Sequence, residues 1–62
     1  MKYEIRRRNK KDKDIWSPVA WADTWEWANE VASALSCVSD GDFAVFIKDG
    51  KMIKTMEEAM KL

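Results

Sequence analysis

The chain opens with two segments in which apolar and polar residues alternate. Residues 2–8 follow the two-residue period of a β-strand with one dry face. Residues 9–14 are all polar and predict a hairpin loop. Residues 15–22 alternate again and predict a second strand. Because Pro18 has no amide hydrogen to donate, we expect this strand either at an edge of the sheet or with the amide position of Pro18 facing outward.

The longest apolar pattern has the period of an α-helix and covers about residues 23–39. Asp23 followed three residues later by Glu26 has the spacing of a capping box, which predicts that Asp23 is the N-cap. Gly41 is expected to end the helix in a left-handed conformation. The apolar side chains form one broad arc. That arc comprises Trp25, Ala28, Val31, Ala32 and Leu35, widened by Trp27, Ala34 and Val38.

A second hairpin is predicted near the C-terminus. Asp49-Gly50 lies between two apolar runs and is the preferred sequence of a two-residue type I′ turn. In the register of that turn, Phe46 is opposite Ile53, and both side chains project from the sheet face that the helix does not cover. Either this face is open, or a short C-terminal helical turn beginning at Thr55 covers it with its methionines.

The order of the elements predicts the fold class. Two strands, a main helix, two strands and a short helical turn indicate an α+β fold of ββαββ type, with an antiparallel sheet and the main helix on one face. We expect residues 1–62 to form a single domain, because a chain of this length has room for one core. If the second strand does not form, the sheet has three strands.

The composition excludes most catalytic and metal chemistry. The sequence has no histidine and one cysteine, Cys37, so a triad that uses histidine, an internal disulfide and a zinc site of four Cys and His ligands are all impossible within one chain. Cys37 is expected to pack as a small hydrophobe. Glu26 and Glu30 lie one helical turn apart and are expected to be solvated charges, not an acid/base pair. We therefore predict no enzymatic activity, no cofactor and no metal.

Charge is segregated along the chain although its total is zero. Residues 14–47 contain no lysine or arginine and carry six carboxylates, whereas the first hairpin is basic. This division predicts two surfaces of opposite sign. The basic side chains of the hairpin are Arg6, Arg7, Arg8, Lys10, Lys11 and Lys13.

These features favour a protein-binding module, because exposed apolar patches and tryptophan anchors mark protein interfaces. The candidate contact residues are Trp16, Phe46 and Ile53 on the uncovered sheet face, with Glu26 and Glu30 on the acidic helix. The acidic stretch suggests a decoy for a basic groove, and homodimerisation would bury the same apolar surface. The alternative is nucleic-acid binding by the basic hairpin, which the zero net charge makes weaker.

The chain has no signal-peptide pattern and no apolar run of transmembrane length, so a cytoplasmic protein is expected. The two alternating strands, the motif Trp21-Ala22-Asp23-Thr24-Trp25-Glu26-Trp27-Ala28 and the closing hairpin resemble the small accessory proteins that phages and prophages encode. That resemblance implies a single α+β domain that inhibits one host enzyme in the host cytoplasm, such as a polymerase or a CRISPR effector. It assigns no functional residue.

Overall fold

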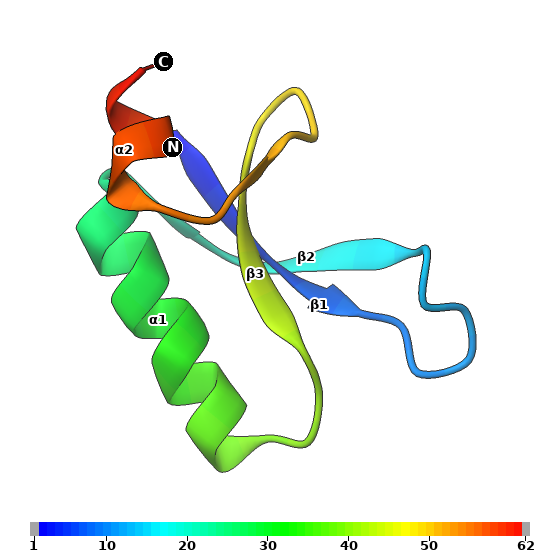
Figure 1. The fold of residues 1–62 in the computed structure, drawn as a ribbon. Helices are drawn as coiled ribbons and strands as arrows, with labels where there is room; N and C mark the ends of the chain where they lie inside the picture. Colours follow the sequence, from blue (N-terminus) through cyan, green and yellow to red (C-terminus); the bar gives the residue numbers. More distant parts are fainter. Residues whose placement is uncertain (1, 62) are drawn as a thin grey trace.

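A computed structural model describes residues 2–61, which form a four-stranded antiparallel sheet and two helices (Figure 1). The sheet order is β2-β1-β3-β4, and the prediction of an α+β fold with one main helix and a short C-terminal helix is confirmed. The strands are β1 (Tyr3–Arg8), β2 (Trp16–Ala22), β3 (Phe43–Ile47) and β4 (Met52–Ile53), and the helices are α1 (Trp25–Val38) and α2 (Met56–Met60).

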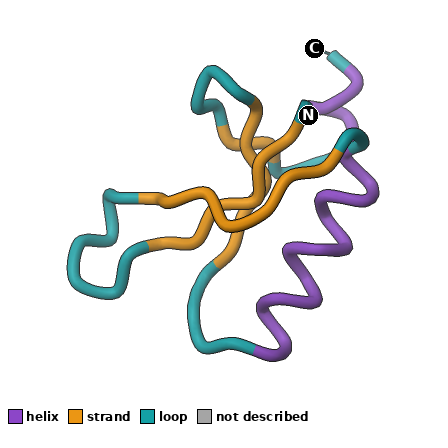
Figure 2. Tube along the Cα trace, turned by 180° about the vertical axis from the view of Figure 1, so that it is seen from behind, coloured by secondary structure: helices purple, strands orange, loops and turns teal. Residues whose placement is uncertain are grey.

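The core lies between α1 and one face of the sheet. Figure 2, seen from behind, shows α1 to one side of the strands, with α2 beside its N-terminal end. Ile5 on the central strand β1 is completely buried. The helix contributes two alanines, which allow its backbone to approach the sheet closely. The buried core cluster comprises Tyr3, Ile5, Ala22, Ala28, Ala32, Val45, Ile53 and Ala59.

The strand β2 is at an edge of the sheet, as Pro18 predicted. Its pairing with β1 is interrupted by a bulge: Ala20 is opposite Ile5 and Pro18 is opposite Arg6, so Val19 is an extra residue without a partner. An extra residue reverses the alternation of side chains beyond it. One face of the sheet therefore carries Trp16 and Pro18 from before Val19, and Trp21 from after it.

The turn between β3 and β4 is one residue longer than predicted. The amide of Gly50 donates to the carbonyl of Ile47 at 2.9 Å, and the amide of Ile47 donates to the carbonyl of Lys51 at 3.0 Å. Gly50 has a φ of +94°. This is the pattern of a three-residue loop, in which a type I turn is followed by a glycine with positive φ.

The longer turn changes which side chains of β4 face the core. Val45 is opposite Ile53 and Phe46 is opposite Met52. Because side chains alternate along a strand, a shift of one residue exchanges the two faces. Ile53 is only 3% exposed and lies in the core, and Met52 lies on the other face. The prediction that Ile53 projects from the uncovered face is therefore wrong.

The helix α1 begins one residue later than the capping-box pattern indicated. Thr24, not Asp23, is the N-cap, and its Oγ1 accepts a hydrogen bond from the amide of Trp27 at 3.2 Å. The capping box of Asp23 and Glu26 is therefore wrong. The helix ends at Val38, before Gly41 is reached. The cap of α2 is as predicted: Thr55 accepts from the amide of Glu58 at 3.2 Å.

Candidate functional site

No helix formed by residues 2–61 covers the sheet face opposite α1, which is called here the open sheet face. Its side chains follow from the cross-strand pairs, because residues directly opposite each other share a face. The bulge at Val19 puts Trp16, Pro18 and Trp21 on this face together. The complete set is Glu4, Arg6, Arg8, Trp16, Pro18, Trp21, Ala44, Phe46 and Met52.

Phe46 is on the open sheet face, as predicted, but its own neighbours cover it. The guanidinium carbon of Arg6 lies 4.7 Å from the centre of the Phe46 ring, and the ring centres of Trp16 and Phe46 are 5.3 Å apart with a tilt of 56°. Arg8 lies over Trp16 in the same way, at 4.7 Å. These stacked contacts leave Phe46 only 5% exposed. Phe46 is thus a poor anchor for a partner, whereas Trp21 is half exposed.

The C-terminal helix does not provide this cover. Ala59 of α2 belongs to the core cluster, on the α1 side of the sheet. Met56 and Met60 point into solvent and are 44% and 78% exposed. Of the two alternatives for this face, cover of Phe46 by the methionines of the C-terminal turn is excluded, and stacked side chains within the sheet face cover it instead.

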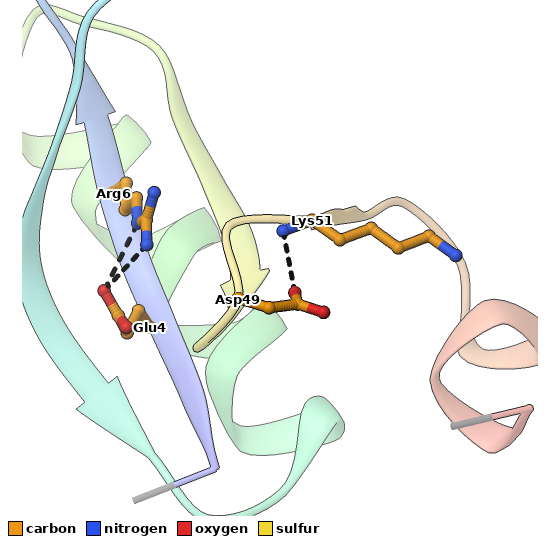
Figure 3. Close-up of polar contacts among 4 residues, drawn as sticks. All are labelled: Glu4, Arg6, Asp49 and Lys51. Carbon is orange, nitrogen blue, oxygen red and sulfur yellow. Dashed lines mark hydrogen bonds and ion pairs between the residues drawn. The ribbon is translucent and has the colours of Figure 1, made fainter.

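Each arginine of β1 forms a hydrogen bond or an ion pair within the protein. Nη2 of Arg6 lies 3.2 Å from Oε1 of Glu4, and Figure 3 shows the two side chains turned toward each other. Arg7 donates to the backbone carbonyl of Asp40, and Arg8 lies 3.6 Å from a carboxylate oxygen of Asp42. These contacts compete with any external phosphate for the same guanidinium groups.

The basic hairpin loop is organised by short-range hydrogen bonds. Oδ1 of Asn9 accepts from the amides of Lys11 and Asp12, at 2.8 and 3.0 Å. Oδ1 of Asp12 accepts from the amide of Asp14. In the second hairpin, Asp49 likewise accepts from the amide of Lys51, whose side chain extends away from it (Figure 3). The lysines of the first loop, Lys10, Lys11 and Lys13, are exposed, as are Asp12 and Asp14 of the same loop.

The outer flank of α1 carries an apolar stripe that the core covers only in part. The stripe consists of Trp27, Val31, Ala34 and Val38, and is called here the α1 stripe. Val31 is half-buried and packs against the core cluster, whereas the other three side chains are exposed. Trp27 is 58% exposed and Val38 is 80% exposed. Three residues of the stripe and Glu30 line a shallow hollow of about 360 Å³. The sequence pattern assigned Trp27 and Val38 to the margin of the core, and so missed them as contact residues.

The predicted acidic residues lie beside this stripe. Glu30 lines the hollow, and Glu26 is one helical turn before it; both side chains are exposed. Cys37 is exposed as well, so the prediction that it packs as a small hydrophobe is wrong. The structure therefore separates the predicted contact residues: Glu26 and Glu30 lie on α1, Trp16 and Phe46 on the open sheet face, and Ile53 in the core.

A groove of about 430 Å³ separates α1 from β3 and β4, and its lining includes Asn29, Ser33, Ser36 and Lys54. Lys54 is the only titratable side chain of that lining. Among residues 2–61, no group of three or more His, Cys, Asp or Glu side chains is arranged to hold a metal ion. Nor does any helix of that range combine the length and hydropathy needed to cross a membrane.

No family model, curated protein or solved structure matches this chain.

Proposed function

We propose that this protein is a small non-enzymatic module that binds another protein through the outer face of α1. The supporting observation is the exposure of Trp27 and Val38 at the two ends of the α1 stripe. Tryptophan is enriched among the residues that dominate binding energy, and a contiguous exposed apolar surface is typical of an interface. An inhibitor of a host enzyme, as the phage resemblance implies, is one form that such a module takes.

The open sheet face supports this proposal less well than α1 does. One face of the Trp16 ring and one face of the Phe46 ring already contact the guanidinium groups of Arg8 and Arg6. A partner would have to displace these contacts before it reached the rings. Within residues 2–61, no cation or aromatic ring stacks on Trp27, the largest side chain of the α1 stripe, and this side chain is more than half exposed.

Nucleic-acid binding through the basic hairpin is the alternative hypothesis. It depends on cations that are free to neutralise phosphates. Arg6 and Arg7 each donate a hydrogen bond within the protein, and Arg8 forms an ion pair with Asp42, which weakens this hypothesis. Binding to phosphates would also fall steeply with added salt, whereas an interface built on Trp27 and Val38 would be much less sensitive.

Affinity capture from the native host, followed by mass spectrometry, tests the proposal. The test variant is Trp27→Gln with Val38→Gln, and the matched control is Ile15→Gln with Val19→Gln, because Ile15 and Val19 are also exposed apolar residues, at 48% and 46%. We expect a specific protein that the test variant loses and the control retains at high salt. Equal capture by both variants would refute the proposal, and so would recovery of nucleic acid that salt removes.

A further inference from the structure

The spacing of the α1 stripe is that of one side of a helix–helix interface. Its residues are separated by four, three and four positions, which is the alternation of the a and d positions of a heptad. Val31 and Val38 take the a positions, and Trp27 and Ala34 take the d positions. A row with this spacing on a helix of 14 residues is complementary to the side chains of a second helix.

The shape of the stripe favours a large side chain of the partner near its middle. Ala34 is small and lies between Val31 and Val38, and the hollow it lines is bounded by Trp27 at one end. A leucine or isoleucine from a second helix would enter this hollow as a knob enters a hole. The same hollow has one charged side chain, Glu30, at its rim.

The charge of α1 favours a basic partner over a second copy. Glu26 and Glu30 are exposed on the flank of the stripe, and residues 14–47 contribute no lysine or arginine to balance them. A lysine from the partner could pair with Glu30 while its methylene groups pack against Trp27. A second copy of the chain would bring the same unbalanced carboxylates to the interface, which is unfavourable.

We infer, on the basis of the proposed function, that the α1 stripe binds an amphipathic helix of another protein, with an apolar a/d seam flanked by lysine or arginine. The contacts that define this site are the seam residues Trp27, Val31, Ala34 and Val38 and the carboxylate of Glu30 beside them.

Two synthetic helical peptides test the inference directly. Both carry three heptads with leucine at a and d, and they differ only in having lysine or glutamate at e and g. Binding is followed by chemical-shift changes of the ¹⁵N-labelled protein at low salt. We expect the lysine peptide to shift the amides of residues 27–38 and the indole of Trp27, and to bind at least about tenfold more tightly than the glutamate peptide.

A charge-reversed variant provides the matched control. Glu26→Lys with Glu30→Lys should reverse the preference, so that the glutamate peptide binds more tightly. Circular dichroism checks that α1 still forms, and Glu30→Lys alone serves if the double variant is unfolded. Equal binding of the two peptides would overturn the inference, as would shifts confined to the open sheet face. Self-association through residues 27–38 without peptide would also overturn it, since a second copy would then be the occupant.

The two proposals fail in different ways. If neither peptide binds, but the variant with Trp27→Gln and Val38→Gln loses a captured protein, the α1 stripe is an interface. The inference that it binds a basic amphipathic helix is then refuted. If capture is also unchanged in that variant, both proposals are refuted.

Discussion

The register of the second hairpin makes a direct prediction about stability. The structure places Ile53 in the core at 3% exposure, and Met52 on the open sheet face, where it is half-buried. The two-residue turn indicated by Asp49-Gly50 would exchange these positions. Replacing each side chain by alanine therefore distinguishes the two registers, and Ile53→Ala should be the more destabilising change.

The size of the effect follows from the buried surface. Ile53→Ala removes three carbons, at about 0.8 kcal/mol each, which gives about 2.4 kcal/mol before any cavity is counted. Measured Ile→Ala changes in cores cost about 2–5 kcal/mol. A chain of 62 residues is stabilised by about 3–9 kcal/mol in total. Ile53→Ala could therefore unfold the domain. The milder change Ile53→Val, which should lower the free energy of unfolding by about 0.5–1.5 kcal/mol, is therefore measured beside it. Met52→Ala should cost about 1 kcal/mol, since the side chain keeps part of its exposure.

Urea unfolding followed by circular dichroism measures these differences. Thermal unfolding gives a second readout, because about 1 kcal/mol lowers the Tm of a domain of this size by about 4–8 °C. Variants whose free energy of unfolding falls with urea at the same slope can be compared through the urea concentration at the midpoint of unfolding. If Met52→Ala cost as much as Ile53→Ala or more, the three-residue turn and the core derived from it would be refuted.

Three further changes test other parts of the structure. Gly41 has a φ of +145°, and a Cβ there would lie 2.9 Å from Nε of Arg7, so Gly41→Ala should lower the free energy of unfolding by about 2 kcal/mol or more. Adding Arg7→Ala should recover only the part of this loss that is due to the clash. Full recovery would show that the backbone of Gly41 is not strained by a side chain. Thr24→Ala should cost about 1 kcal/mol in urea unfolding and Asp23→Ala less, and the reverse order would restore Asp23 as the N-cap. Cys37 is exposed, so a maleimide should label it in the folded protein within a few-fold of its rate in urea; strong protection would show that the residue is buried.

Features that depend on neighbouring residues were predictable from the sequence. The alternation in residues 2–8 and 15–22, the helical period and the turn residues are properties of short segments, and they predicted the order of the elements. Pro18 indicated an edge strand because the missing amide hydrogen is a property of that one residue.

The errors arose where two local solutions are nearly equivalent. Asp23 and Thr24 are both good N-cap residues, and in the structure Thr24 takes the cap with an extended backbone. Asp49-Gly50 fits a two-residue and a three-residue turn, and the structure has the register in which Ile53 is buried. Periodicity does not reveal either choice, because it records which residues are apolar and not which side of the chain meets the sheet.

For the candidate site, the sequence alone determined the available chemistry: no histidine, one cysteine, and an acidic stretch without basic residues from 14 to 47. These are facts of composition and need no coordinates. Only the tertiary structure decided which apolar side chains reach solvent. Phe46 is covered because Arg6 and Trp16 from other strands stack on it, and Trp27 is exposed because the sheet contacts a narrower arc of α1 than the apolar pattern covers. Burial depends on residues distant in sequence, and the order of apolar residues along the chain does not contain that information.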